Sequence, residues 1–409
     1  MRARITILSL LLLALGVLRG LDAAEPKTLL CSKAASDGDF VTLPVEIGDE
    51  RFVFVVDTGC VTSLFDKSLE AKLTVHDEAI LPKEVLPGRF SVQFRPPAMN
   101  VLGTEEGSLP FPAESSLVRC IDLSDVSEAC DQPIAGILGM DFLSRYVLQL
   151  NLSEGEIRLL ENVSFTGVEH DAVVDLVMYT RRPFAVVWAG DIPFPALVDT
   201  GAIGATLYLT PKHYEYLRER ERLLLLPLKH LVDGETQIHG EEPALIPVFQ
   251  LGPFKHYGVQ ANGDDDLALL GLPYFLRYKA TFDFSGRRLY LQKSPHFEMV
   301  DESFHSGIYL RVEEAVERRA FVEVICSGTY ADKNGVQIGD RLLSINDVSI
   351  AKMSQCHITR RLSQRRFGDC RLELERDGEK FVVTLPKVGD QTPPKMEEEG
   401  EEETPADGQ

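Results

Sequence analysis

The feature that most constrains the fold of this 409-residue chain is an internal repeat. The run Arg51–Gly59 resembles Phe194–Gly201, and both runs end in Asp-Thr-Gly. Further on, Gly136–Tyr146 resembles Leu269–Tyr278, and each is followed by a polar-turn hairpin pattern. Short β-branched and aromatic runs, broken by Gly, Pro and Asp, dominate both stretches and are typical of strands. We therefore expect a mainly β chain with two similar lobes of about 130 residues each.

The charge composition of the chain limits the kinds of molecule that it can bind. The chain carries 42 Lys plus Arg against 63 Asp plus Glu, a formal net charge of −21 at pH 7. A strongly acidic chain repels phosphate backbones and anionic membranes, so we expect no nucleic acid among its partners. A hydrophobic content of 44% over this length fits two or three globular domains rather than disorder or a coiled coil.

The N-terminus predicts export. Arg2 and Arg4 precede an apolar run over Ile5–Val17, and small residues follow up to Ala24. This order is typical of a secretory signal peptide, cleaved after Ala23 or Ala24. We therefore expect a periplasmic or extracellular protein, with a membrane anchor as the alternative if the signal stays uncleaved. No later stretch approaches the roughly 18–20 consecutive apolar residues of a membrane span, so no integral span is expected after cleavage.

Export also permits the seven cysteines to oxidise. Their odd number leaves at least one thiol free or paired between chains. Cys120 and Cys130, ten residues apart in a polar stretch, are the best intrachain pair, although the sequence leaves the connectivity open.

The two Asp-Thr-Gly triplets carry the candidate chemistry. Each closes an apolar strand run and is followed by a hydroxyl residue and a new apolar run, Thr62–Phe65 in one half and Thr206–Leu209 in the other. Further along each half, two apolar residues and a glycine follow the triplet, Ile137–Gly139 in the first half and Leu269–Gly271 in the second. These elements, in this order over residues 38–292, resemble the aspartic peptidase family in its two-lobed, single-chain form. The resemblance is to exported bacterial members with retropepsin-like or pepsin-like β-barrel halves.

The residues of the triplets suit acid–base chemistry. Gly59 and Gly201 permit a tight turn that presents Asp57 and Asp199 at the ends of their strands. Two carboxylates that face each other across a seam cannot both ionise, so they share one proton. The ionised member would take a proton from a water molecule. The protonated member would polarise the scissile carbonyl and later protonate the leaving nitrogen.

The resemblance implies an endopeptidase that hydrolyses polypeptide substrates with a water activated between the two aspartates, without a metal or organic cofactor. It also implies that Thr58 and Thr200 form hydrogen bonds across the interface and hold the two loops rigid. Gly139 and Gly271 would be the structural partners of the triplets. Because one chain holds both aspartates, we expect a monomer.

One departure from the family keeps a second interpretation open. Cys60 stands where the family usually has Ala or Ser, and a disulfide at this position would crowd the site. The alternative to an enzyme is a catalytically inactive, protease-like scaffold that binds peptides on the same folds. The covering loop is not assigned, although residues 86–92 and 230–236 are the best candidates.

The pattern changes after Gly307. A Gly-x-x-Ala-x-x-x-Gly-Val-x-x-Gly-Asp-x-Leu-x-x-Ile-Asn run over Gly328–Asn346 closely resembles the PDZ family. We expect a helical turn over Ala331–Asn334, a helix over Met353–Arg366 and a closing Asp-Gly hairpin over Arg371–Leu385.

The PDZ resemblance implies peptide capture. Such modules add a chain end or an extended segment as a strand beside an exposed sheet edge. The backbone of Gly307, Ile308, Tyr309 and Leu310 would receive the carboxylate, with the Met353–Arg366 helix as the opposite wall. The alternative is a PDZ fold that only packs against the other lobes.

The patterns together predict five segments: a signal peptide over residues 1–24, a first protease-like lobe over 25–164, a second over 165–296, a PDZ domain over 297–389 and an acidic tail over 390–409. The tail holds six Glu between positions 397 and 403, so it lacks the apolar content for a core and we expect it to be disordered.

Overall fold

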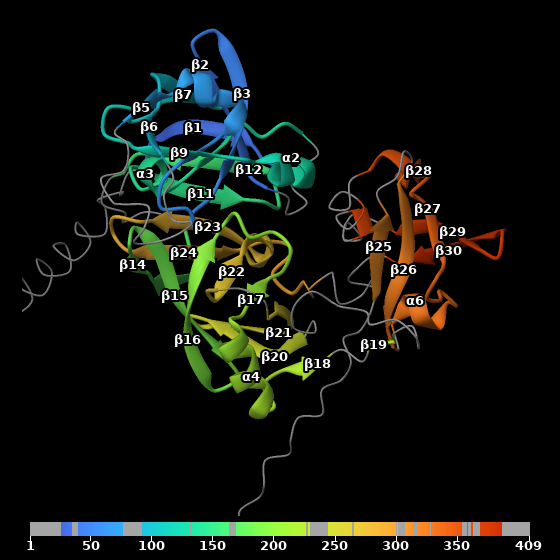
Figure 1. The fold of residues 1–409 in the computed structure, drawn as a ribbon. Helices are drawn as coiled ribbons and strands as arrows, with labels where there is room; N and C mark the ends of the chain where they lie inside the picture. The colour runs from blue at the N-terminus through green and yellow to red at the C-terminus, as the bar shows by residue number, and fades with distance from the viewer. Residues whose placement is uncertain are drawn as a thin grey trace, which may run out of the picture.

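The computed structural model describes residues 26–34, 40–76, 92–130, 132–162, 169–225, 228–229, 244–263, 266–299, 301, 307–313, 318–327, 329–353, 358, 361–362 and 369–386. The expected signal peptide, the acidic tail and, apart from Val92, both candidate covering loops lie outside these residues. Figure 1 shows two β-rich lobes and, beside them, a C-terminal unit of strands. The predicted mainly β class is confirmed. Within the described residues, no helix is long and apolar enough to cross a membrane.

Within its described residues, the first lobe contains twelve strands and three short helical segments. They are β1 Thr28–Lys33, β2 Thr42–Ile47, β3 Glu50–Val56, β4 Leu64–Asp66, η1 Lys67–Lys72, β5 Thr74–Val75, β6 Gln93–Arg95, β7 Met99–Leu102, β8 Ser108–Pro110, β9 Val118–Ile121, α2 Ser124–Cys130, β10 Gly136–Leu138, α3 Met140–Leu143, β11 Val147–Asn151 and β12 Glu156–Leu160. In β2, Leu43, Val45 and Ile47 are buried and alternate with half-buried residues, which is the period of two that a strand requires.

The second lobe repeats this order. It contains β13 Ala172–Asp175, β14 Val177–Tyr179, β15 Arg182–Ala189, β16 Ile192–Asp199, β17 Leu207–Tyr208, α4 Pro211–Glu219, β18 Leu224–Leu225, β19 Leu228–Lys229, β20 Ala244–Leu251, β21 Phe254–Asn262, β22 Leu269–Gly271, η2 Leu272–Arg277, β23 Tyr278–Asp283 and β24 Arg288–Lys293. In each lobe a short strand, β10 or β22, lies parallel to the strand that leads to the Asp-Thr-Gly triplet and antiparallel to the strand that follows it. The two halves that repeat in sequence therefore also share the same strand topology.

A six-stranded sheet joins the two lobes, in the order β1-β12-β11-β23-β24-β13. This order is a palindrome, because β13, β24 and β23 of the second lobe correspond to β1, β12 and β11 of the first. At its centre Gln149 of β11 pairs with Thr281 of β23, and the Gln149 side-chain amide donates a 2.9 Å hydrogen bond to the Thr281 hydroxyl. Gln149 and Thr281 occupy equivalent positions of the repeat, so the pseudo-twofold axis passes between them.

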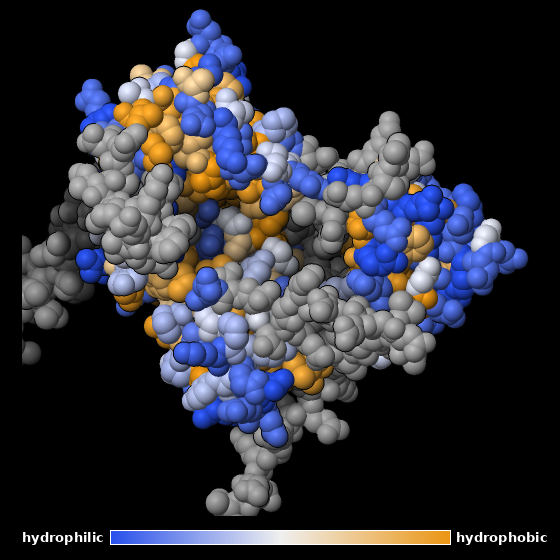
Figure 2. Space-filling view, in the orientation of Figure 1, coloured by the Kyte–Doolittle hydropathy of each residue, from blue (hydrophilic) through white to orange (hydrophobic). Residues whose placement is uncertain are grey.

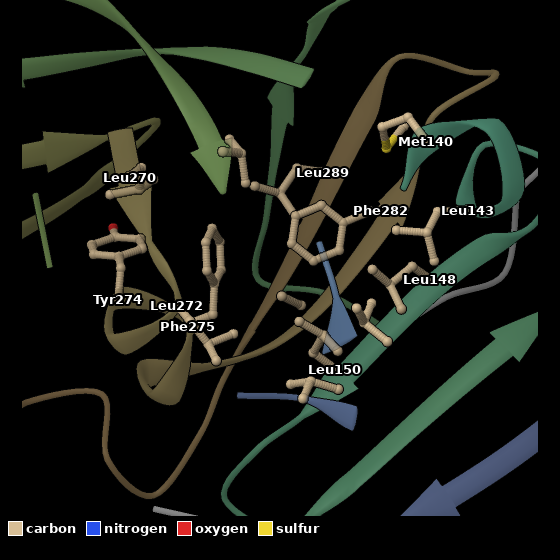
Figure 3. Packing of buried hydrophobic residues seen from close by; sticks show 14 of the residues in the cluster. Met140, Leu143, Leu148, Leu150, Leu270, Leu272, Tyr274, Phe275, Phe282 and Leu289 are labelled. Carbon is tan, nitrogen blue, oxygen red and sulfur yellow. The ribbon is translucent and has the colours of Figure 1, made fainter. Parts of the chain in front are cut away.

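Both lobes contribute to one hydrophobic core. Figure 3 shows Met140, Leu143 and Leu148 of the first lobe packed around the ring of Phe282, with Phe275 on the other side. All five side chains are fully buried. Burial of apolar area on this scale is the main favourable term in folding, so each lobe stabilises the other.

The C-terminal unit has a core of its own and contains β25 Ile308–Glu313, β26 Arg319–Cys326, α6 Tyr330–Lys333, β27 Arg341–Ile345, β28 Val348–Ser349, η3 Ile350–Lys352, β29 Cys370–Arg376 and β30 Glu379–Leu385. The expected helical turn is α6, and the expected hairpin is β29–β30, with Asp377 and Gly378 at positive φ in the turn. Of the helix expected over Met353–Arg366, the structure describes helical residues only at 358, 361 and 362.

The C-terminal unit contacts both lobes. β19, from the second lobe, pairs with β26 of the C-terminal unit, where Leu228 is opposite Cys326 and Lys229 is opposite Ile325. Arg318, just before β26, forms a 3.2 Å ion pair with Glu128 of α2 in the first lobe.

The segment that leads into the C-terminal unit is anchored in the second lobe. Asp301 is buried and forms a 2.6 Å ion pair with the fully buried Arg277, and it accepts a 2.5 Å hydrogen bond from the main-chain N–H of Gln260. Phe297 and Met299 pack against the shared core of the lobes. A buried ion pair with an added main-chain donor fixes where the chain leaves the lobe.

The expected disulfide is not formed. No disulfide joins any of the six cysteines in the described part of the chain, Cys120 and Cys130 included. The thiol of Cys120 on β9 donates to the main-chain oxygen of Asp66 at 3.4 Å, whereas Cys130 ends α2 and packs on a separate cluster around Val55. The pairing expected from their proximity in sequence is therefore wrong, because the two side chains belong to different contacts.

Candidate active site

The ends of two equivalent strands bring the predicted aspartates together. Asp57 follows β3 directly, and its main-chain N–H donates to the carbonyl oxygen of Leu138 on β10 at 3.0 Å. Asp199 is the last residue of β16 and pairs with Gly271 of β22. Figure 2 shows that the surface is hollowed between the two lobes, with hydrophilic residues at the floor and hydrophobic residues around it.

Each glycine of the triplets lies against the aspartate of the other lobe. A Cβ atom added to Gly59 would lie 2.3 Å from Oδ2 of Asp199, and one added to Gly201 would lie 2.7 Å from Cγ of Asp57. Distances this short leave room only for hydrogen, so these positions require glycine. The two carboxyl groups therefore face each other across the pseudo-twofold axis.

The main chain of each loop fixes one oxygen of its own aspartate. Oδ1 of Asp57 accepts hydrogen bonds from the N–H groups of Gly59, at 2.7 Å, and Cys60, at 3.0 Å. Oδ1 of Asp199 accepts a 2.8 Å bond from the N–H of Gly201. The main chain of each loop thus fixes the orientation of its carboxyl group.

Thr58 and Thr200 connect the two loops. The hydroxyl of Thr58 donates to the carbonyl oxygen of Val198 at 2.7 Å and accepts from the N–H of Thr200 at 3.1 Å. Thr200 makes the matching pair of bonds, to the carbonyl oxygen of Val56 at 2.8 Å and from the N–H of Thr58 at 3.1 Å. Both threonines are fully buried, so these four bonds are shielded from water.

The two acids are electrostatically coupled. Burial, together with the charge of Asp199 and a hydrogen bond to it, raises the pKa of Asp57 to about 8, although the N–H donors of Gly59 and Cys60 act in the opposite direction. A proton is therefore held by the pair at neutral pH, where an isolated carboxyl would have lost it. This is the protonation state in which one carboxyl is an acid and the other is a base.

Gly139 and Gly271 allow a second segment of each lobe to pack closely under its aspartate loop. A Cβ on Gly139 would lie 2.9 Å from the carbonyl oxygen of Cys60, and one on Gly271 would lie 2.8 Å from that of Ala202. The N–H groups of the following residues, Met140 and Leu272, donate to the carbonyl oxygens of Cys60 and Ala202, respectively. These contacts are equivalent in the two lobes.

Our reading of the sequence missed a third carboxyl group near the site. Asp141 in α3 is 8% exposed, and its Oδ1 accepts bonds from the N–H of Ser63 at 2.9 Å, the hydroxyl of Ser63 at 2.7 Å and the N–H of Phe142 at 3.0 Å. The Ser63 hydroxyl also accepts from the N–H of Gly139 at 3.0 Å. The signal that could have found Asp141 is a charged residue in an otherwise apolar run after Gly139. Comparison of the two repeats does not reveal it, because the second lobe has Pro273 at the equivalent position.

Cys60 does not crowd the site with a disulfide. Its thiol is free and donates to the carbonyl oxygen of Thr62 at 2.9 Å. Burial, together with the charge of Asp57, raises the pKa of this thiol to about 12, so it stays neutral at any pH at which the dyad could work.

The four residues predicted to receive a peptide end lie at the start of the C-terminal unit. Gly307 has a φ of 62° and precedes β25, which pairs with β26 and with no other strand that the structure describes. Ile308 is buried in the core of the C-terminal unit, and Leu310 packs against it. The half-buried Tyr309 instead packs with Cys326 and with Leu245 of the second lobe. One edge of β25 is thus without a described partner, as strand addition requires.

Residues 296–365 match the family model of the PDZ domain, so the C-terminal unit contains a PDZ domain. No curated protein matches the sequence. The solved structures with weak similarity to the chain include the following two. Basic 7S globulin from soybean is 11% identical, with 67% of this chain and 97% of that chain covered and a TM-score of 0.40. A retropepsin-like aspartic protease from Rickettsia conorii is 18% identical, with 29% and 88% covered and a TM-score of 0.22.

These similarities are too weak to carry an argument about activity. What the fold defines is a duplicated, mainly β chain with a PDZ domain after the second lobe. Among the described residues, no three His, Cys, Asp or Glu side chains gather as metal ligands.

Proposed function

We propose that this chain is an exported aspartic endopeptidase that hydrolyses peptide bonds with a water activated between Asp57 and Asp199. The observation that carries the proposal is the approach of each carboxyl group to the glycine of the opposite triplet, 2.3 Å and 2.7 Å from an added Cβ. Export rests on the basic and apolar pattern of the first 24 residues alone.

The chemistry follows from one shared proton. The ionised carboxylate takes a proton from water as the water oxygen bonds to the scissile carbonyl carbon. The protonated carboxyl donates a hydrogen bond to the carbonyl oxygen and neutralises the charge that develops there. When the tetrahedral intermediate collapses, the C–N bond breaks and a proton from the dyad passes to the leaving nitrogen. The pair then regains its starting state.

The PDZ domain is proposed to bind a peptide end or extended segment along the edge of β25. This mode uses main-chain hydrogen bonds for affinity and side-chain pockets for selectivity. Substrates that present such a segment would be held near the lobes, because β26 is joined to the second lobe through β19. The effective concentration of a substrate held in this way is higher at the lobes, so it is cleaved faster.

A peptide digestion assay tests the proposal. The mature protein is incubated with a diverse peptide pool, and new termini are read by mass spectrometry for the parent, for Asp57→Asn and for Asp199→Asn. We expect cleavage by the parent alone, with Asp49→Asn, a change at an exposed turn, as the matched control that retains activity. A folded parent that cuts nothing between pH 3 and pH 9 would leave the inactive peptide-binding scaffold as the better description.

We expect the pH profile of kcat/KM to stay high up to an unusually alkaline pH. The raised pKa of Asp57, about 8, means that the dyad keeps its proton through neutral pH and loses it above that value. We expect kcat/KM to fall about tenfold per pH unit above about pH 8, because the doubly ionised pair has no acid. Initial rates on one peptide from pH 4 to pH 10 measure this limb. A limb near pH 5 would contradict a proton held by two coupled, buried carboxyl groups.

A further inference from the structure

The strand of the PDZ domain that would receive a peptide is itself in contact with the second lobe. Tyr309, the second residue of β25, packs with the buried side chains of Leu245 on β20 and Cys326 on β26. The N–H of Cys326 donates to the carbonyl oxygen of Gly307 at 2.8 Å, so the same cluster holds the residue before β25. Figure 1 shows β25 on the side of the C-terminal unit that faces the lobes. The proposed peptide edge therefore begins at a contact with the second lobe.

The two ends of β26 are held by different lobes. At its C-terminal end, the main chain of β26 pairs with β19 of the second lobe. Just before its N-terminal end, Arg318 forms the 3.2 Å ion pair with Glu128 of the first lobe. A rise of about 3.3 Å per residue places these two contacts about 25 Å apart. β25 pairs with β26 over its whole length, so the contacts that hold β26 also fix the direction of β25.

A third anchor lies where the chain enters the PDZ domain, at the buried ion pair of Arg277 with Asp301. The exposed ion pair of Arg318 contributes little free energy by itself. Contacts at three separate places nevertheless fix both the position and the orientation of a domain, whereas a flexible tether fixes neither. The β25 edge therefore lies at a constant distance from the two aspartates.

The strand order gives an upper bound for that distance. From Leu245 on β20, the sheet runs through β21, β17 and β22 to β16, which ends at Asp199, with directly paired residues at every step. Four steps between neighbouring strands of about 4.8 Å each give about 20 Å, and the packed side chains of Tyr309 and Leu245 add about 10 Å. A gap of about 30 Å is spanned by about nine residues of extended chain.

Resting on the proposed function, we propose that the PDZ domain determines where substrates are cut. The β25 edge takes the free C-terminal carboxylate of a polypeptide, and the two aspartates cleave that polypeptide at a fixed number of residues from its end. The count is about nine if the chain runs directly to the aspartates and about thirteen if its last four residues first lie along β25. Because the spanning segment must be extended, the substrate class is polypeptides with unfolded C-terminal segments.

Two matched peptide pools test the fixed spacing. They hold the same sequences, long enough to span the gap, with a free carboxylate at the C terminus in one pool and an amide in the other. Mass spectrometry reads each cut and counts its position from both ends. We expect the cuts in the free-acid pool to cluster at one count from the C terminus, with initial rates at least about tenfold above those of the amide pool. Residues inserted between the cut and the C terminus should move the cut along the sequence by the same number.

Leu245→Ala tests the contact between the PDZ domain and the second lobe. It removes the lobe side of the cluster and leaves every residue of the PDZ domain in place. We expect the cluster of cut positions to broaden, while the affinity for a labelled C-terminal peptide, measured by fluorescence anisotropy, stays the same. Tyr257→Ala, which removes a side chain of the same lobe that is 63% exposed, is the matched control and should keep the narrow cluster. An equally narrow cluster in Leu245→Ala would show that this contact does not set the spacing.

A measurement without cleavage separates this inference from the proposed function. In Asp199→Asn, peptides carry a photo-crosslinker at successive positions counted from the C terminus. We expect crosslinks to the Asp57–Cys60 loop to peak about nine to thirteen residues from that end. A parent that cuts nothing, with this peak present, would overturn the proposed function and leave the fixed spacing intact. Equal rates in the two pools without a cluster, or crosslinks without a peak, would overturn the fixed spacing and leave peptide hydrolysis to stand on its own test.

Discussion

We expect Asp57→Asn to give a protein that lacks the proposed peptide cleavage and is more stable than the parent. We expect kcat to fall by at least about 10³-fold, since the one remaining carboxyl group cannot be acid and base at the same time. The gain in stability, about 1–3 kcal/mol at pH 8, arises because the buried pair of like acids is replaced by an acid beside a neutral amide. The asparagine oxygen can still accept from the N–H groups of Gly59 and Cys60, so the loop geometry is kept.

The pH dependence of this gain identifies its cause. The pKa of Asp57 is raised in the folded state, to about 8, above the ordinary value near 4 of the unfolded chain. The folded state therefore holds a proton that the unfolded state releases, and the parent loses stability as the pH rises from about 4 to about 8. Below pH 4 both states are protonated, and the advantage of the variant should vanish.

Thermal and denaturant unfolding of parent and variant at pH 4, 6 and 8 measure this effect. Asp49→Asn, at an exposed turn, is the control and should change stability by no more than a few tenths of a kcal/mol at any of these values. Retained cleavage by Asp57→Asn, or an advantage that grows towards acid pH, would contradict the coupled dyad.

Thr58→Val has the second large effect. Valine has nearly the same shape but cannot bond, so it leaves the carbonyl oxygen of Val198 and the N–H of Thr200 without their partner in a fully buried seam. We expect a loss of about 2–4 kcal/mol in the free energy of unfolding, the cost of two unsatisfied buried groups. Activity should fall as well, because the dyad is no longer held by bonds from both lobes.

Thr58→Ser is the matched control, since it keeps the hydroxyl and removes only a methyl group. Thr200→Val should have an effect of the same size, by the pseudo-twofold symmetry of the four bonds. The double valine variant should lose less than the sum of the single losses, because each hydroxyl accepts from the main-chain N–H of the other threonine and the two sites are coupled. Strict additivity, or a Thr58→Val protein as stable as Thr58→Ser, would show that the bonds across the seam contribute little.

Local sequence patterns were sufficient to predict the parts of the fold that repeat or carry strong turn signals. The duplicated triplets predicted two similar β-rich lobes, and the Asp377–Gly378 pair predicted the last hairpin. The Cys120–Cys130 pairing failed because proximity in sequence says nothing about which face of an element a side chain occupies.

Other features could not be predicted because they depend on contacts between distant segments. The pairing of β19 with β26 involves two residues that show no strand pattern of their own. Asp141 became a candidate only when the fold placed it against Ser63, 78 residues earlier in the chain. The approach of Gly59 to Asp199 likewise depends on how the lobes meet, which no local pattern records.

The central pairing of β11 with β23 has a consequence for how such a site can change over time. In an assembly of two identical chains, every substitution would appear twice, once on each side of the axis. Here the two sides belong to one polypeptide, so a change on one side leaves the other untouched. The chain already differs in this way, with Asp141 two residues after Gly139 in one half and Pro273 two residues after Gly271 in the other. Covalent fusion has thus freed the two halves to specialise, and dilution cannot separate them.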